Sequence, residues 1–139
     1  EEHGTFDVVF VLGLLYHLDA PDVFRFVRQV RELCSGVVII DTLISIDSVE
    51  TVNYDGQAYC GRRHREHADE DSPETRRERV LKSIDNTLSF RFTRESLVRA
   101  VEDAGFSSVV ECHTPREPDK AIDRATFAAT GKTRVPIHT

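Results

Sequence analysis

The stretch that decides the fold runs from Phe6 to Leu18 and reads FDVVFVLGLLYHL. Its first half, Val8 to Leu12, is an unbroken apolar run rich in β-branched and aromatic residues. A strand with one face in water alternates apolar and polar residues, so this run predicts a strand buried on both faces of a parallel sheet. Gly13 then permits a sharp turn or a close backbone approach. Tyr16 and His17 follow at the carboxyl end of the strand, where ligands gather in open α/β sheets.

The next segments predict a βαβ unit. Apolar residues recur at helical spacing from about Pro21 to Leu33, and Pro21 suits a first helical position, while Ser35-Gly36 is expected to end the helix. A second apolar strand is expected at residues 37–46, after a right-handed crossover. The remaining expected elements are a short polar helix at 74–84, an extended segment at 86–92, a helix at 94–104, and two closing strands at 107–113 and 124–130.

From residue 47 to residue 71 the periodicity is lost, apart from a turn signal at Asn53-Tyr54-Asp55-Gly56. A loop of this length in a compact domain is usually functional or disordered, so we interpret residues 47–92 as an insertion that covers the substrate. Arginines in such a loop could bind a carboxylate or phosphate through paired hydrogen bonds. Tyr59 and Arg62 are the candidate substrate-binding residues, and the alternative for each is a place in a solvated charge run.

Composition limits the class of protein. The chain has 139 residues, 40% of them hydrophobic, and a net charge of −6, which suits one domain or part of one and argues against a nucleic-acid-binding surface. It contains no apolar run of membrane-spanning length, begins without a signal-peptide pattern, and has three widely spaced cysteines. We therefore expect a soluble cytoplasmic protein without a membrane partner. No metal site is expected, because Cys60, His64, His67 and Asp69 lack paired ligand spacing.

Two phrases in this order resemble the C-terminal half of a class I S-adenosylmethionine (SAM)-dependent methyltransferase. They are FDVVFVLGLLYHLDAP near the start and SFRFTRESLVRAVEDAGF before the closing strands. The resemblance implies an α/β fold with half of a Rossmann-like sheet: a βαβ unit, a long loop, a helix and a terminal antiparallel hairpin. The turn LYH and the closing IDRATFAATGK resemble more narrowly the branch that includes the tRNA wobble-uridine carboxymethyltransferases. The acceptor, a small molecule or tRNA, and the choice between methyl and carboxymethyl transfer stay open.

The resemblance also implies a cofactor site for SAM. Gly13 and Leu14 would line it, and Tyr16 and Arg124 would hold the cofactor. The alternatives are a plain strand-to-helix turn, a core tyrosine and a surface arginine.

Two residues are candidates for catalysis. His17 could be a general base, because an imidazole exchanges protons near neutral pH, or it could cap the turn. Asp41 lies in an apolar strand, where a carboxylate is costly unless paired. It could therefore act near the acceptor or be the buried partner of one of the loop arginines.

The sequence departs from the family in one large respect. It contains no GxGxG loop, which these enzymes use to bind the cofactor. We therefore expect residues 1–139 to be the C-terminal portion of a methyltransferase domain, inactive alone, with an exposed sheet edge that favours self-association. The alternatives are a non-catalytic methyltransferase-like binding or assembly module and a nucleotide-dependent oxidoreductase.

Overall fold

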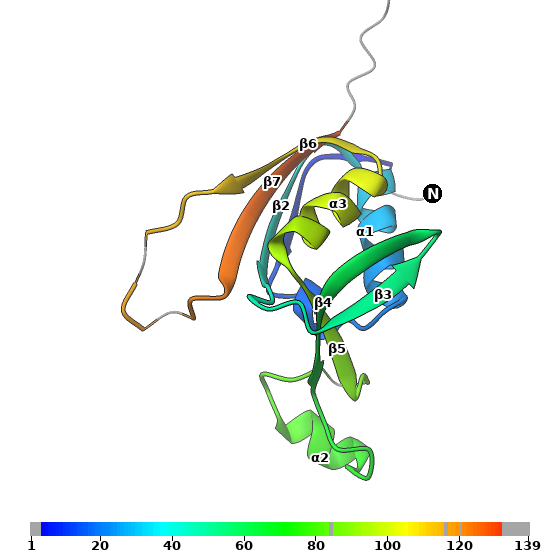
Figure 1. Ribbon diagram of the computed structural model, residues 1–139, viewed down its shortest axis with the longest axis vertical. Coiled ribbons are helices and arrows are strands. Elements are labelled where there is room, and N and C mark those ends of the chain that lie inside the picture. Colours follow the sequence, from blue (N-terminus) through cyan, green and yellow to red (C-terminus); the bar gives the residue numbers. More distant parts are fainter. Residues whose placement is uncertain (1–3, 84, 116, 120, 132–139) are drawn as a thin grey trace, which may run out of the picture.

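The computed structural model describes residues 4–83, 85–115, 117–119 and 121–131 of the chain (Figure 1). Its elements in chain order are β1 (Phe6–Leu12), the 3-10 turn η1 (Leu15–His17), α1 (Asp22–Leu33), β2 (Cys34–Leu43), β3 (Glu50–Tyr54), β4 (Gln57–Arg65), α2 (Pro73–Glu78), β5 (Leu88–Phe92), α3 (Arg94–Asp103), β6 (Phe106–Cys112) and β7 (Arg124–Gly131). They form two sheets with the longer helices between them (Figure 1).

The larger sheet has the strand order β1-β2-β7-β6. β1 and β2 are parallel and joined through α1, whereas β7 runs antiparallel to both β2 and β6. This topology confirms the predicted fold class, a βαβ unit followed by a terminal antiparallel hairpin. The predicted stop at Ser35-Gly36 is wrong, because α1 passes directly into β2 at Cys34. Gly36 instead serves the sheet, since a Cβ there would collide with the backbone carbonyl of Asp7.

The second sheet corrects the expectation of a loop without regular structure. Residues 50–65 form the β3–β4 hairpin, and β5 adds to β4 to give a three-stranded antiparallel sheet. The predicted turn is present, with positive φ at Asp55 (52°) and Gly56 (77°). The strands were hidden in the sequence because the consecutive charged and polar residues Arg62, Arg63 and His64 interrupt the apolar–polar alternation of β4.

The helix expected at 74–84 is shorter than predicted. α2 begins with the Ser72 hydroxyl accepting a hydrogen bond from the Thr75 amide (3.2 Å) and ends at Glu78, where Arg79 leaves helical geometry. Val80 and Leu81 follow it on the surface, and Ile84 lies outside the described residues.

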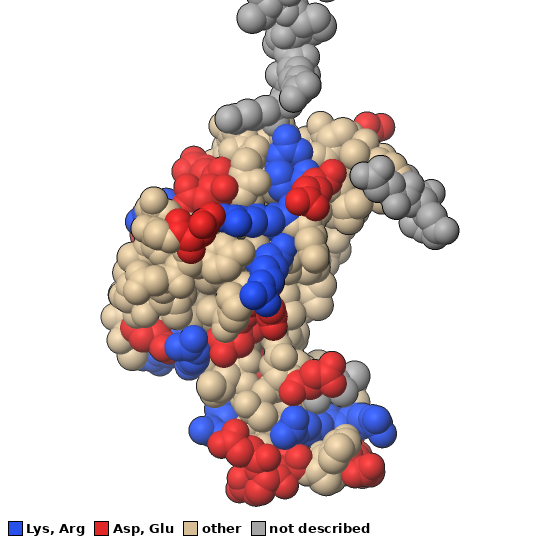
Figure 2. All heavy atoms as spheres, turned by 90° about the vertical axis from the view of Figure 1, so that its right-hand side faces the viewer, with Lys and Arg blue, Asp and Glu red and all other residues tan. Residues whose placement is uncertain are grey.

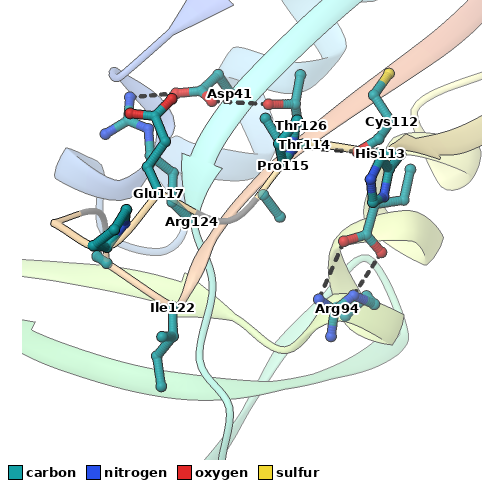
Figure 3. Close-up of a pocket in the computed structure, with 14 residues that line it drawn as sticks. Asp41, Arg94, Cys112, His113, Thr114, Pro115, Glu117, Ile122, Arg124 and Thr126 are labelled. Carbon is teal, nitrogen blue, oxygen red and sulfur yellow. Dashed lines mark hydrogen bonds and ion pairs between the residues drawn. The ribbon is translucent and has the colours of Figure 1, made fainter.

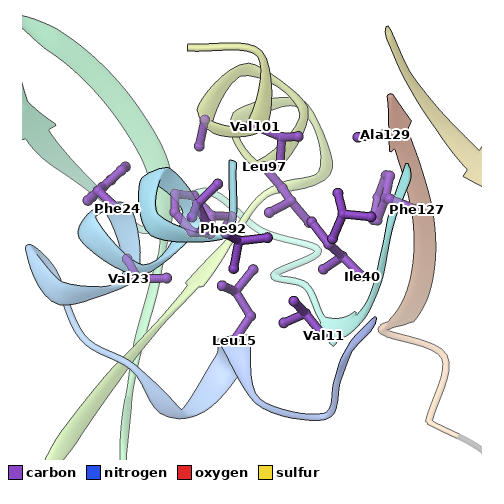
Figure 4. Close-up of a cluster of buried hydrophobic side chains, with 14 of the residues drawn as sticks. Val11, Leu15, Val23, Phe24, Ile40, Phe92, Leu97, Val101, Phe127 and Ala129 are labelled. Atoms are coloured by element: carbon purple, nitrogen blue, oxygen red, sulfur yellow. The ribbon is translucent and has the colours of Figure 1, made fainter. Parts of the chain in front are cut away.

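The core lies between the larger sheet and the two long helices (Figure 4). Phe24 of α1 is its link to the second sheet, because its ring stacks on Tyr54 (4.5 Å between centroids) and meets Phe92 edge-on (5.3 Å). The other members drawn there include Val11, Leu15, Ile40, Leu97, Val101 and Phe127. This shared core fixes the second sheet against the first, and so positions the insertion over the end of β1.

The described residues cover the opposite face of the larger sheet less completely than the face that packs against α1 and α3. Alternate side chains of β1 are exposed by 49–65%, namely Phe6, Val8, Phe10 and Leu12. The prediction that β1 is buried on both faces is therefore wrong for this chain. α1 and α3 both lie on the other side of the sheet, so only Val9 and Val11 of this strand reach the core.

Candidate functional site

The turn after β1 brings three predicted cofactor residues together. Gly13 adopts a left-handed φ of +69°, and its amide donates to the carbonyl of Asp41 on β2 (2.9 Å). A Cβ at Gly13 would lie 3.7 Å from Tyr16 Oη and 3.8 Å from Arg124 Nη2. Glycine is therefore suited to this position by its backbone conformation, whereas a Cβ there would make only ordinary van der Waals contacts.

Arg124 and Asp41 form an ion pair at the same edge. The Arg124 guanidinium donates to Asp41 Oδ1, and the Thr126 hydroxyl donates to Asp41 Oδ2 (2.9 Å). The hydrogen bond with Asp41 raises the pKa of Arg124, with a smaller contribution from Tyr16. Asp41 thus pairs with an arginine, but with Arg124 of β7 and not with one of the loop arginines. Arg124 keeps 39% of its side chain exposed and so remains able to meet a ligand.

These residues border a cavity of about 780 Å³ (Figure 3). Asp41, Arg124 and Thr126 lie on one wall, and Arg94 lies on another, where its guanidinium makes two hydrogen bonds to Glu111 (2.6 and 3.1 Å). Ile122 and Pro115, from the segment between β6 and β7, supply apolar surface. The cavity is large enough for a ligand of the size of a nucleoside with a short side chain.

Leu14 and His17 take different places in this turn. Leu14 is 45% exposed. His17 turns toward the insertion, with its ring 4.3 Å from that of Tyr16 and its Nδ1 3.4 Å from Glu66 Oε2.

Glu66 is a residue that the sequence analysis missed. It is 3% exposed and accepts hydrogen bonds from the Ser89 hydroxyl (2.7 Å) and the Ser83 amide (3.3 Å). Burial works to raise the pKa of Glu66, but these hydrogen bonds and His17 lower it overall, so the carboxylate stays ionised. The only signal in the sequence was its place in a mostly acidic run, which does not distinguish a buried carboxylate from solvated ones.

The two candidate substrate residues lie in different surroundings. Tyr59 is 2% exposed, and its hydroxyl donates to Asp103 of α3 (2.7 Å). Burial and this hydrogen bond raise the pKa of Tyr59 to about 12. That placement suits a core tyrosine rather than substrate contact. Arg62, by contrast, is exposed and lines a second cavity of about 350 Å³.

The four possible metal ligands are not gathered into a site. His64 Nε2 lies 3.0 Å from Lys82 Nζ, and His67 Nδ1 lies 3.1 Å from Arg79 Nη1. Within the described ranges, no group of three His, Cys, Asp or Glu side chains could hold a metal ion. In the same part of the chain, no helix is long and apolar enough to cross a bilayer.

Comparison with known proteins gives matches among solved structures alone. No family model and no curated protein sequence matches the chain. The N-terminal domain of EvdMO1, crystallised with SAH and D-fucose, superimposes with a TM-score of 0.64 at 22% identity, over 96% of this chain and 49% of that one. An O-methyltransferase family protein from Burkholderia thailandensis gives a TM-score of 0.53 at 16% identity, over 94% of this chain and 31% of that one. A putative O-methyltransferase from Nostoc punctiforme gives 0.52 at 16% identity, over 91% and 32%.

The chain has a partial Rossmann-like α/β fold that it shares with part of each of these three proteins. The chain spans about half the length of the EvdMO1 domain and about a third of the other two proteins. The convergence of Gly13, Tyr16, Asp41 and Arg124 at the carboxyl edge of β1 and β2 agrees with the general position of ligands in open α/β sheets.

Proposed function

We propose that this chain forms part of a SAM-dependent methyltransferase and contributes one wall of its cofactor site. The observation that carries the proposal is the convergence of Gly13, Tyr16, Asp41 and Arg124, of which Asp41 and Arg124 line the 780 Å³ cavity. The proposal is also supported by the likeness in fold to structures that include an SAH-bound domain.

The residues at the turn fit a zwitterionic cofactor. Arg124 offers a half-exposed cation for a carboxylate, and its ion pair with Asp41 holds the guanidinium in place. Gly13 lets the backbone approach a ligand closely, and Leu14 is exposed beside it. SAM supplies a methyl group already activated by its positive sulfur. The protein therefore has mainly to align the acceptor with that methyl group and to exclude water.

His17 is the proposed general base for an acceptor hydroxyl. Nδ1 of this imidazole is buried without a hydrogen-bond partner among the described residues, and Glu66 Oε2 lies 3.4 Å from it. A carboxylate at that position favours the tautomer protonated on Nδ1, which leaves Nε2 free to accept a proton. Glu66 would act through His17 and is a positioning residue.

The acceptor we favour is a small molecule rather than tRNA. Figure 2 shows that, on the face in view, basic side chains lie beside acidic ones, both over the two sheets and around the projecting helix α2. That face therefore offers no extended basic surface for a phosphate backbone. The likeness to the wobble-uridine branch, with carboxymethyl transfer, stays a narrower alternative.

A second candidate function is a non-catalytic binding or assembly module. The specific observation in its favour is the exposed apolar face of β1, which includes Val8, Phe10 and Leu12. In this interpretation the face would bind another protein chain, and the cavity beside Arg124 would be a remnant of the fold.

The test is calorimetric titration of SAH into this chain and into the same chain joined to about a hundred residues that precede it in the parent protein. We expect tight binding only in the longer chain, and at least about tenfold weaker binding when Arg124→Gln is introduced there. Arg94→Gln is the matched control, because this arginine is paired on another wall of the cavity. Absence of SAH binding in both chains would refute the methyltransferase proposal and favour the assembly module.

A further inference from the structure

Two arginines lie opposite each other on neighbouring strands of the second sheet. Arg62 of β4 and Arg91 of β5 are direct partners in the antiparallel ladder, so their side chains leave the same face of the sheet. Like charges directly opposite one another destabilise a sheet unless an anion lies between them or near them. We propose that Arg62 and Arg91 form a binding subsite for an oxyanion, a carboxylate or a phosphate, on a small acceptor molecule. The link to an acceptor rests on the proposed function, whereas the anion subsite itself does not.

Arg91 has a donor that no described residue satisfies. Its Nε is buried and has no hydrogen-bond partner among the described residues. Its Nη1 lies 3.9 Å from Asp123 Oδ2, which is an ion pair but too long for a hydrogen bond. A buried donor without a partner is unfavourable, and an oxyanion is the kind of group that would satisfy it.

Arg62 is in a similar position closer to solvent. Its side chain is 55% exposed, and Asp47 Oδ2 lies 3.9 Å from Nη2. Asp47 is itself 75% exposed, so water screens this pair strongly. Each guanidinium therefore has a carboxylate nearby without a hydrogen bond to it, and each can turn donors toward a ligand.

Both arginines line the 350 Å³ cavity. Its other walls come from the segment that follows β2 and from the segment that precedes β7. They include the apolar Ile44, Ile46 and Ile122, together with Asp47 and Asp123, the carboxylates that lie near the two guanidinium groups. Paired cations beside an apolar wall suit a small molecule with an anionic group and a short carbon skeleton. An inorganic anion alone would use the charges but not the apolar wall.

The subsite lies next to the proposed cofactor residues. The Arg91 guanidinium carbon is 6.0 Å from the centre of the Tyr16 ring, and Tyr16 Oη lies near Gly13 and Arg124. An acceptor anchored by Arg62 and Arg91 would thus have Tyr16 beside it. In this arrangement Arg91 contributes both to the anion subsite and to the position of the Tyr16 ring.

The direct test follows the Arg91 Nε–H signal by NMR while inorganic phosphate or acetate is added to the chain. We expect this signal to shift with saturation, and Arg62→Gln to weaken the binding read from it by about tenfold or more. Binding to Arg91→Gln, which lacks this signal, is followed by the Arg62 Nε–H signal and should be weakened to a similar degree. Arg65→Gln is the matched control, because this arginine lies on the same strand but pairs with Asp69 outside the cavity. Arg62→Lys should bind with intermediate affinity, because lysine keeps the positive charge but lacks the planar group that makes two parallel hydrogen bonds to an oxyanion.

Each outcome decides the proposal. Tighter binding of phosphate than of acetate would assign a phosphorylated acceptor, and the reverse would assign a carboxylic acid. No saturable shift in the unmodified chain, or equal weakening by Arg65→Gln, would overturn the subsite. Retained near-ultraviolet circular dichroism in the variants would exclude misfolding as the cause. Anion binding together with absence of SAH binding in the longer chain would leave the subsite standing and refute only the methyltransferase function.

Discussion

At the scale of single residues, the surroundings of Glu66 predict how the stability of the chain depends on pH. Its carboxylate is buried, and hydrogen bonds from Ser89 and Ser83 help to lower its pKa below the ordinary value of 4.5. A lowered pKa in the folded state gives stability that is fully present above the unfolded pKa and is lost as the pH falls through the folded one. We expect Glu66→Gln to reduce the free energy of unfolding at pH 7, and the difference from the unmodified chain to shrink below about pH 4.5.

Urea unfolding at several values of pH between 7 and 3 measures this effect. Glu70→Gln is the control, because that side chain is exposed in the same acidic run. A difference between the unmodified chain and Glu66→Gln that stays constant down to pH 3 would show that the Glu66 carboxylate is not stabilised by the fold.

At the scale of elements, the contact between β4 and β5 depends on Gly61. A Cβ at this position would lie 2.6 Å from Phe90 Cζ and would also meet the backbone carbonyl of Arg91. Because neither the ring nor the ladder can move freely in a packed core, Gly61→Ala should destabilise the chain by about 1–3 kcal/mol. It should also disturb the Arg62–Arg91 pair, which is the next rung of the same ladder.

Chemical denaturation monitored by circular dichroism measures the loss. Gly56→Asn is the matched control in the same hairpin, because its Cβ would meet nothing within 4 Å and asparagine tolerates the left-handed φ of +77°. We expect the control to change stability by no more than about 0.5 kcal/mol. An equally small effect of Gly61→Ala would contradict the close packing described here.

At the scale of the whole molecule, we propose that the chain associates with itself through β1. This strand is at the edge of the larger sheet, and four of its apolar side chains are 49–65% exposed on one face. An exposed edge strand with an apolar face is a site of strand pairing and aggregation. Sedimentation velocity at increasing concentration should show dimers or larger species, and Phe10→Lys should shift them toward the monomer.

Val80→Lys is the control for this experiment, because Val80 is 90% exposed but follows α2, away from the larger sheet. Equal suppression of association by both variants would mean that added charge, rather than the β1 face, is responsible. A monomer at all concentrations in the unmodified chain would refute self-association through this edge.

The sequence predicted some elements of the fold well and missed others. The apolar runs of β1 and β2, the helix from Pro21 and the closing hairpin predicted the larger sheet, since buried strands and amphipathic helices carry strong local patterns. The β3–β4 hairpin was missed because charged residues at Arg62, Arg63 and His64 mask its alternation. Its burial depends on Phe24, which is more than thirty residues away in the sequence.

The same distinction applies to the candidate site, where the sequence predicted some residues and only the structure showed how they are paired. By itself the sequence determined the turn at Gly13 and marked Asp41, because a polar residue that interrupts an apolar strand stands out locally. Tyr16 and Arg124 became cofactor candidates through the resemblance of the motifs around them. Only the tertiary structure paired Asp41 with Arg124, placed Glu66 against His17 and set Arg62 opposite Arg91. Each of these is a contact between charges distant in the chain, and such contacts leave no periodic trace in the sequence, because strand register and packing alone decide which side chains meet.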